Sequence, residues 1–345
     1  MTTTDRPNGS SFQRKQKAER PMVPKAEFGS YYGSPVLNPP VWESPDIPGY
    51  LFLGGLAGGS SLLGAGASLT GRPALAAVTK SGAIAGAALS MYFLVHDLGR
   101  PARFLNMLRV FKVTSPMSVG SWLLAAYVPA AGVAAATDLW GMAGLRDLPG
   151  RRLLGAASTA GAAVLGPFVA SYTAALISDT AVPSWHDGYP EMPFIFTGSG
   201  AMAAGGLGLL GTSVLGASAG EAVPARNLAL LGAAMESAAM RRMTRRLTLT
   251  AEPFATGRAG KYVKAAKILA GLGAAGTVAS AFPLPVRARR AVAAVSGVAL
   301  VAGSACTRWG IFHAGVASAE DPKYTVIPQR ERLESEAAGH AGSKG

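Results

Sequence analysis

Long apolar stretches separated by short polar loops occupy most of the chain between residues 50 and 317. Each stretch is close to the roughly 20 residues that a helix needs to cross the hydrocarbon core of a bilayer. Lipid offers the backbone no hydrogen-bond partners, so each stretch is expected to be a helix. The sixth stretch departs most from this pattern because it is short and contains Glu236. The pattern predicts eight membrane-spanning helices, at about 50–70, 75–95, 117–138, 153–177, 193–217, 223–240, 262–282 and 291–317.

Polar segments flank this region on both sides. Residues 1–48 are polar and rich in proline, and they lack the apolar core of a signal peptide, so we predict a cytoplasmic N-terminal arm. Aromatic residues in the later part of the arm, such as Trp42, can lie against the membrane or a partner protein. Residues 49–320 form the predicted membrane domain, and residues 321–345 form a polar C-terminal tail.

The composition favours a membrane protein. The 345 residues are 49% hydrophobic and only 15% charged, whereas about a quarter of the residues of a soluble protein are charged. The chain also contains 44 glycines, and glycine clusters recur within the apolar stretches, as at 54–59 and 205–211. Small residues let membrane helices approach closely, although such a cluster can also open the backbone to a flat ligand. We therefore predict an all-α membrane protein.

The basic residues are unevenly distributed between the loops. A formal net charge of +13 would point to nucleic acid in a soluble protein. Here most of the 32 Lys and Arg residues lie in the arm, the tail, and the loops that follow the second and sixth predicted helices. Positive charge is retained on the cytoplasmic side, so we predict a multi-pass protein of the inner membrane with both termini in the cytoplasm. The same residues suit anionic lipid or an acidic partner subunit rather than nucleic acid.

A polar cluster, His96-Asp97-Leu98-Gly99-Arg100-Pro101, directly follows the second apolar stretch. Charged side chains at membrane depth are costly and mark functional sites. If the helix continues, Asp97 and Arg100 lie on one face and can pair, and Pro101 then ends or bends it. One interpretation is a salt-bridged helix end at the headgroups. The other is a polar pocket in which a carboxylate and a histidine exchange protons with a ligand and with water.

Other polar residues interrupt the apolar stretches further along the chain. Tyr172-Thr173, in the fourth stretch, can bond to a neighbouring helix or to a ligand carbonyl. Glu236 is either a carboxylate on a proton path or is neutralised by the arginines that follow it. Arg308 is expected to pair with a buried carboxylate such as Asp138 or Glu236. The polar loop around Trp185 is expected to form a lid on the side of Asp97.

The sequence offers few ligands for a resident metal or metal cofactor. Cys306 is the sole cysteine, whereas an iron–sulfur cluster takes about four thiolates. A bis-histidine haem needs two histidines that face each other across helices. The chain offers His96 and His313, which both lie near the cytoplasmic end, His186 in a loop and His340 in the tail. We expect no haem, no iron–sulfur cluster and no metal site in this chain.

Three elements around the Asp97 cluster resemble the NrfD/PsrC family of membrane subunits: DLGRP at 97–101, RFLNML at 103–108 and TSPMSVGSW at 114–122. The glycines of the first stretch and Tyr172-Thr173 are similar to that family too, and the resemblance runs from about Tyr31 to Asp321. The long element through residue 122 is specific, whereas glycine patches alone are not. Two departures are that Ala174 replaces a glycine common in the family, and that no histidine of the first helix accompanies Tyr172.

The resemblance implies an architecture and a set of partners. It implies eight helices in two four-helix bundles, with a quinone, menaquinone in many such systems, bound between helices of the first bundle. The quinone then lies near the surface that docks a ferredoxin-like four-cluster iron–sulfur subunit. That subunit exchanges electrons with a molybdopterin catalytic subunit.

The resemblance also assigns candidate roles to residues of this chain. Tyr172, Asp97 and His96 become candidates for contact with the quinone or for its protonation. Independently of the resemblance, Glu236 is a candidate for proton movement because it is a carboxylate within an apolar stretch. Arg100 and the basic loop after it become candidates for docking. The expected quinone-binding residues are Tyr172, Thr173, Arg100, Ser121 and Trp122.

The sequence therefore predicts a membrane anchor that passes electrons between a partner iron–sulfur subunit and the quinone pool. The partner module resembles either formate dehydrogenase or polysulfide reductase, and the charge bias favours a cytoplasmic one. The chain itself is expected to be a subunit of an oxidoreductase. One alternative is an eight-helix secondary transporter or proton channel, in which Asp97, Glu236 and Arg308 line a path. Another is a purely structural anchor without a bound quinone.

Overall fold

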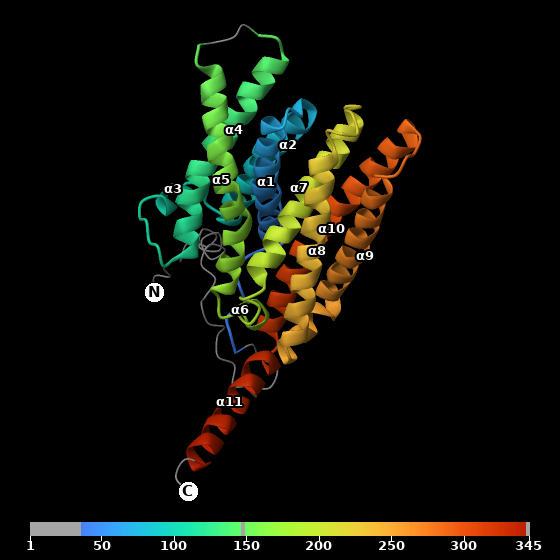
Figure 1. The fold of residues 1–345 in the computed structure, drawn as a ribbon. Coiled ribbons are helices and arrows are strands. Elements are labelled where there is room, and N and C mark those ends of the chain that lie inside the picture. Colours follow the sequence, from blue (N-terminus) through green and yellow to red (C-terminus); the bar gives the residue numbers. More distant parts are fainter. Residues whose placement is uncertain (1–35, 146–148, 343–345) are drawn as a thin grey trace, which may run out of the picture.

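Eight long helices form the body of the protein in the computed structural model, which describes residues 36–145 and 149–342 (Figure 1). Each corresponds to one predicted stretch, so the all-α fold with about eight helices is confirmed. The part of the predicted arm at residues 1–35 lies outside the described residues. The eight helices are α1 (Asp46–Leu69), α2 (Pro73–Asp97), α4 (Pro116–Met142), α5 (Arg151–Ser178), α7 (Met192–Val214), α8 (Val223–Arg246), α9 (Gly257–Ala279) and α10 (Val286–Glu320). Shorter elements are α3 (Arg103–Met107), α6 (Pro183–His186), the 3-10 helix η1 (Leu249–Phe254), and α11 (Lys323–Gly342), which forms most of the C-terminal tail.

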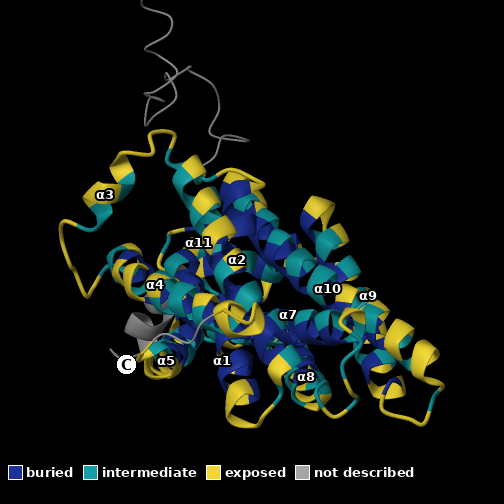
Figure 2. Cartoon of the chain, turned by 90° about the horizontal axis from the view of Figure 1, so that it is seen from above, coloured by how far each residue is buried: buried dark blue, intermediate teal, exposed yellow. Residues whose placement is uncertain are grey.

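The helices pack as two groups of four, α1, α2, α4 and α5 in one and α7 to α10 in the other. The groups meet where α1 packs along α7, with further contacts from α5 and α10. Seen from above, α1 and α7 lie at the buried centre of the molecule, and exposed residues gather on the outer helices (Figure 2). This is the two-bundle organisation that was expected.

Glycines allow the closest helix crossings at this centre. A Cβ atom on Gly58 of α1 would lie 2.2 Å from the carbonyl oxygen of Gly166 on α5. A Cβ atom on Gly59 would lie 2.7 Å from the carbonyl oxygen of Gly200 on α7. No side chain fits at these distances, so the glycines let the helix backbones touch, as the packing interpretation predicted.

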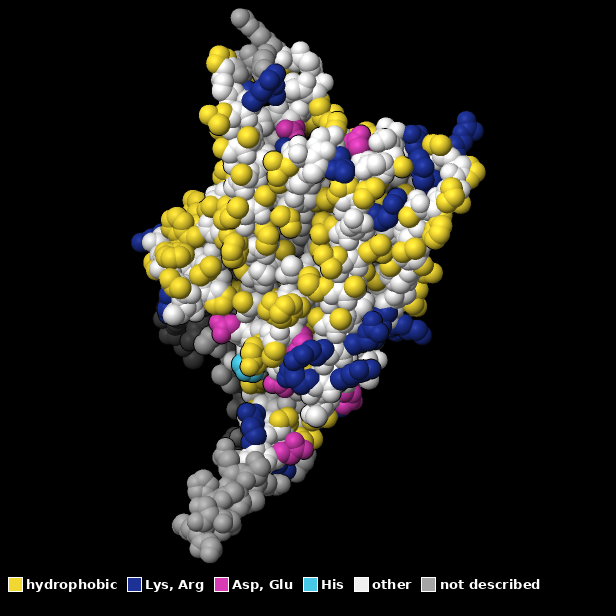
Figure 3. All heavy atoms as spheres, in the orientation of Figure 1, with side chains coloured by type: hydrophobic (Ala, Val, Ile, Leu, Met, Phe, Trp, Pro, Cys, Tyr) yellow, Lys and Arg dark blue, Asp and Glu magenta, His cyan; other side chains and the backbone are white. Residues whose placement is uncertain are grey.

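The charge pattern along the helices fits a membrane-spanning body. Six of the eight helices are long and apolar enough to cross a membrane, and α8 and α9 are the other two. Glu236 and Arg241 lie on α8, and Lys261, Lys264 and Lys267 lie on α9. Hydrophobic side chains cover the middle of the visible face, and Lys and Arg cluster toward both ends (Figure 3). Such a belt suits a bilayer, with basic side chains reaching the headgroups on either side.

Helix α2 ends two residues beyond the predicted stretch and does not continue to Arg100. Its last residue is Asp97, and Gly99 then adopts a positive φ of 64°, a conformation that ends helices and that glycine adopts without strain. Asp97 and Arg100 therefore do not share a helix face, and the condition for a pair between them is not met. Among the described residues, no carboxylate pairs with the exposed Arg100.

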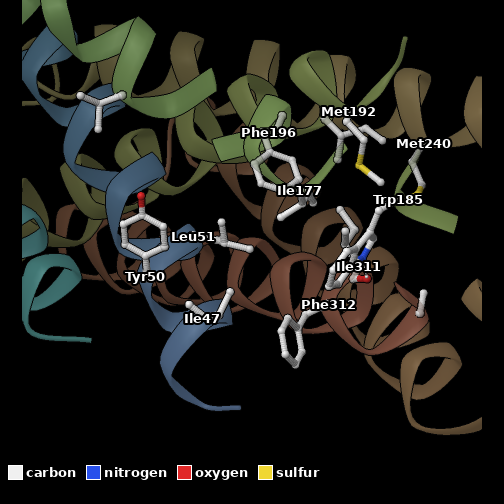
Figure 4. Packing of buried hydrophobic residues seen from close by; sticks show 14 of the residues in the cluster. Ile47, Tyr50, Leu51, Ile177, Trp185, Met192, Phe196, Met240, Ile311 and Phe312 are labelled. Atoms are coloured by element: carbon white, nitrogen blue, oxygen red, sulfur yellow. Dashed lines mark hydrogen bonds between the residues drawn. The ribbon is translucent and has the colours of Figure 1, made fainter. Parts of the chain in front are cut away.

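The polar loop after α5 is a buried anchor rather than the expected lid. Trp185 of α6 is 0% exposed, and its Nε1 donates a hydrogen bond to the carbonyl oxygen of Ile311 on α10 at 2.8 Å. Figure 4 shows Trp185 beside Ile311 and Phe312. The Trp185 ring lies 5.9 Å from that of Phe312 and 5.7 Å from that of Trp42. Trp42 thereby ties the described end of the arm to the helical body. Burial of these large aromatic rings stabilises the loop in this position, although polar residues surround them in the sequence.

An ion pair joins the start of α7 to the end of α8. Glu191 is buried, and Arg246 donates to both of its carboxylate oxygens, at 3.0 Å from Nε and 2.7 Å from Nη2. Arg242 lies 3.4 Å away. The hydrogen bond from Arg246 is the main cause that lowers the pKa of Glu191 below its usual 4.5.

We expect Glu191→Gln to lower the stability at pH 7 by about 1 kcal/mol, because the arginines are partly exposed and screened. Because the pKa of Glu191 is lowered in the folded state, its ionised carboxylate contributes its full stabilisation above pH 4.5. This stabilisation is lost as the pH falls through the pKa of the folded protein. The variant should therefore lose less stability than the wild type between pH 6 and pH 3. Thermal unfolding in detergent measures both effects. Glu320→Gln, an exposed carboxylate, is the control, and equal pH profiles for all three proteins would contradict the prediction.

Candidate functional site

A small cavity lies at the end of the first bundle, where α2 ends and α1, α4 and α5 converge. It brings together Asp97, Ser121 and Tyr172, three of the residues predicted from the sequence. The other lining residues are Trp42, Ile47, Tyr50, Leu94, Leu98, Met107, Met117, Leu124 and Leu176. With Tyr50 included, polar residues from four helices line one space with mainly apolar walls, which is the usual form of a small-molecule site.

Two tyrosine hydroxyls meet in this cavity. Tyr50 of α1 and Tyr172 of α5 hydrogen-bond to each other through their hydroxyl groups. Gly120 of α4 leaves room for the Tyr172 ring, because a Cβ atom there would lie 2.2 Å from the ring. Sequence reasoning missed Tyr50, although it is the first residue of the first apolar stretch and so lies at the membrane end that Asp97 occupies.

Asp97 lies between the cavity and the chain that leads into α1. Its Oδ1 accepts a hydrogen bond from the backbone N–H of Glu43 at 3.2 Å. The carboxylate is therefore held by the described end of the arm rather than by Arg100. Ser121 hydrogen-bonds to its own helix, since its hydroxyl donates to the carbonyl oxygen of Met117 at 2.9 Å.

His96 lies beside the cavity and does not line it. Its Nδ1 is 2.6 Å from Oδ2 of Asp46, the first residue of α1, and its side chain is 62% exposed. Its ring stacks on that of Tyr92, with the centroids 5.8 Å apart. Asp46 was not predicted from the sequence, since nothing in the pattern brings it next to His96. His96 is accessible to water, Asp46 is buried, and His96 adjoins Asp97 in the chain.

Two further predicted residues face away from the cavity. Thr173 is buried next to Tyr172, but its hydroxyl has no hydrogen-bond partner. Trp122 is 43% exposed on the outer side of α4, where its ring meets the edge of Phe111. A helical residue that neighbours a site residue in sequence lies about 100° around the axis, so adjacency in a motif does not bring both to one space.

Glu236 lies in the other bundle, away from the tyrosine cavity. The hydroxyl of Thr307 donates to Oε1 of Glu236 at 2.6 Å. Glu236 lines a separate cavity between α8 and α9. Among the described residues, Arg308 forms no ion pair with Asp138 or Glu236, so the expected pairing is wrong. It is fully buried, and its Nη2 donates to the carbonyl oxygen of Phe196 at 2.7 Å.

Asp138 pairs instead with Lys80 of α2, at 2.7 Å. The Lys80 side chain is 7% exposed, so a cation is buried in the first bundle toward the end opposite Asp97. Sequence reasoning missed this residue, although a lone lysine inside the second apolar stretch was a visible signal.

The donor set of the tyrosine cavity suits a flat ligand with carbonyl oxygens. One tyrosine hydroxyl donates to the other, which leaves one hydroxyl proton that can be donated to a ligand. Asp97 can exchange a proton, and the walls are apolar. The enclosed volume is about 60 Å³, less than the roughly 150 Å³ of a cavity that holds benzene. A ring therefore enters only if side chains at the cavity move. Met107 and Met117 are suited to this because unbranched methionine side chains adapt their shape.

Comparison with known families gives a match over most of the chain. The family model described as polysulphide reductase, NrfD, matches residues 35–319, which includes all eight long helices apart from the last residue of α10. The match also includes every residue predicted for the site. No curated protein matches the chain.

Proposed function

This chain belongs to the NrfD family of polysulphide reductase membrane subunits, and we propose that it is the quinone-reactive anchor of a molybdopterin oxidoreductase. It is a multi-pass membrane protein, and proteins of its family work with iron–sulfur and molybdopterin subunits. In the proposed complex, electrons pass between the cluster of a ferredoxin-like partner and the quinone pool. The catalytic module is of the formate dehydrogenase or polysulfide reductase type, and the expected quinone is menaquinone.

The observation that carries the proposal is the meeting of Tyr50, Tyr172 and Asp97 in one cavity at a membrane end. A bound quinone supplies the redox chemistry, since it takes up two electrons and two protons. The tyrosine hydroxyls then serve to hold a carbonyl oxygen, and the apolar walls exclude water around it. A site at the end of the bundle also leaves a short distance to a partner docked on that surface.

Three titratable side chains beside the cavity can supply it with protons. The Asp97 carboxylate lines the cavity, and His96 lies at the surface beside it, bonded to the buried Asp46. Histidine exchanges protons readily near neutral pH, and a carboxylate can take a proton from it or from water. In this proposal His96 collects protons and Asp97 delivers them. Glu236 lines another cavity, so any part it plays in proton movement is separate from this delivery.

The surface beside the cavity supports partner docking. The loop from Leu98 to Ser115 carries Arg100, Arg103, Arg109 and Lys112, and it exposes Leu105, Val110, Phe111 and Val113. Exposed apolar side chains rimmed by charge are typical of interaction surfaces. We propose that this loop contacts the iron–sulfur subunit.

We expect both termini to be cytoplasmic, together with the tyrosine cavity. A fluorescent protein fused after the last residue should fluoresce, since the reporter folds only in the cytoplasm. An alkaline phosphatase inserted in the loop between α4 and α5 should be active, because that loop lies at the opposite end of the helices. The reverse result for both reporters would place the catalytic partner outside the cytoplasm.

Gentle purification from native membranes tests the proposed function. We expect an iron–sulfur subunit and a molybdopterin subunit to copurify, with about one quinone extracted per complex. A lone protein without quinone would favour the transporter alternative instead. Partners without quinone, together with normal activity of Tyr172→Phe and Asp97→Asn complexes, would indicate a purely structural anchor.

A further inference from the structure

A groove separates α8 from α9 on the outer side of the second bundle. These two neighbours pack closely against α7 and α10 respectively but only loosely against each other. The space between them has a volume of about 530 Å³. Its walls are lined by small side chains, among them Ala233, Ala234, Ala270, Gly271 and Ala274.

One end of the groove is cationic. Arg241 of α8 and Lys267 of α9 both line it and both are exposed. Helical side chains lean toward the N-terminus of their helix, and α8 and α9 run in opposite directions, so these two side chains lean toward each other. Among the described residues, neither has a carboxylate partner, whereas the nearby Arg242 and Arg246 are paired with Glu191. Arg241 and Lys267 thus place two cations without carboxylate partners at the α8–α9 groove.

A buried polar atom faces the same groove further from the surface. Glu236 is 7% exposed, and while its Oε1 is bonded by Thr307, its Oε2 has no hydrogen-bond partner. It lies five residues from Arg241 on α8, which is about 7 Å along the helix axis. A protonated carboxyl at this depth can donate a hydrogen bond from Oε2. The groove therefore offers cations at its mouth, a polar contact below them and an apolar floor.

We propose that the α8–α9 groove binds one anionic phospholipid of the surrounding bilayer. The phosphate lies between Arg241 and Lys267, and an ester carbonyl lies near Glu236. An acyl chain continues along the alanine wall as far as Leu230. The stretch from Leu230 to Thr244 is about 20 Å long, which exceeds the roughly 15 Å of one leaflet of the hydrocarbon core. The lipid would bridge α8 and α9, which pack only loosely against each other.

Lipid retention by the purified protein tests this site. Native mass spectrometry would compare phosphatidylglycerol with phosphatidylcholine of the same acyl chains, added to the detergent-purified chain or complex. We expect the wild type to retain one phosphatidylglycerol and to retain phosphatidylcholine at least tenfold less. The double variant R241Q/K267Q should lose at least tenfold in phosphatidylglycerol retention.

Two further variants separate this site from general surface charge. R245Q/K261Q removes the same charge from exposed positions at the same membrane end, outside the groove, and should change retention less than twofold. Ala234→Phe keeps every charge but fills the groove from an exposed position of its wall, and it should lose the lipid.

Several outcomes would overturn the proposal. Equal losses in the two double variants would indicate diffuse attraction to the basic surface, and unchanged retention in Ala234→Phe would place the lipid elsewhere. Loss of a copurified subunit from R241Q/K267Q, with lipid retention intact, would assign the two cations to a protein partner. A wild type that retains no lipid would overturn the site outright.

Discussion

Replacing Gly58 by alanine is expected to remove most of the folded protein from the membrane. The new Cβ atom would lie 2.2 Å from the carbonyl oxygen of Gly166 and 3.1 Å from the backbone nitrogen of Ala170. These are backbone atoms, so no side chain can rotate away, and α1 and α5 must separate. Overpacking a well-packed core typically costs about 1–3 kcal/mol, and a backbone clash at the centre of the fold should reach the upper end. The fraction of monodisperse protein after solubilisation, and its unfolding temperature, measure the effect.

A matched control lies on the same helix. Gly66→Ala adds the same methyl group to α1 at an exposed position where nothing lies within 4 Å. It should leave the folded fraction unchanged or raise it slightly, because alanine favours a helix over glycine. Gly166→Ala should reproduce the loss of Gly58→Ala, since the clash is reciprocal at 2.5 Å. Equal behaviour of Gly58→Ala and Gly66→Ala would show that α1 and α5 do not meet at these glycines.

The second large effect concerns the hydroxyl of Tyr172. In the proposed complex, Tyr172→Phe should lower quinone reduction by about tenfold, because the loss of one hydrogen bond of roughly 1.4 kcal/mol corresponds to that factor. Tyr50→Phe should act similarly, and the double variant should lose less than the product of the two, since the hydroxyls bond to each other. Turnover with a soluble quinone analogue measures kcat and KM for each variant.

Two controls show whether a loss of turnover arises at the quinone site. Electron transfer from the substrate to an artificial acceptor should be unchanged, because it bypasses the membrane subunit. Tyr189→Phe removes the hydroxyl of a tyrosine that is 63% exposed before α7, and it should keep the wild-type rate. If Tyr172→Phe and Tyr50→Phe both turn over quinone at the wild-type rate, the cavity between them is not the quinone site.

The charged groups of the two bundles line separate sites. Asp97 and Glu236 line different cavities, and Lys80 pairs with Asp138 toward the end of the first bundle opposite Asp97. The proposed quinone site and the proposed lipid groove can therefore be altered independently by mutation. The variants of Tyr172 and of Arg241 should have separable effects, the first on quinone turnover and the second on lipid retention.

The number, approximate bounds and direction of the long helices follow from the sequence alone. A bilayer imposes a length of about 20 residues on each crossing and requires internal hydrogen bonds, so apolar runs translate directly into helices. Asp97, Ser121 and Tyr172 could also be assigned to one membrane end, because the count of crossings and the motif around residues 97–122 place them there.

Only the tertiary structure decided which side chains face each other. A helix that is apolar all round can be rotated about its axis without exposing a polar stripe, so the sequence does not reveal its contact face. This is why the structure was needed to pair Tyr50 with Tyr172 and Lys80 with Asp138, and to separate Glu236 from the tyrosine cavity. Close approach of glycines such as Gly58 and Gly166 sets those rotations, and distant packing determines which residues meet.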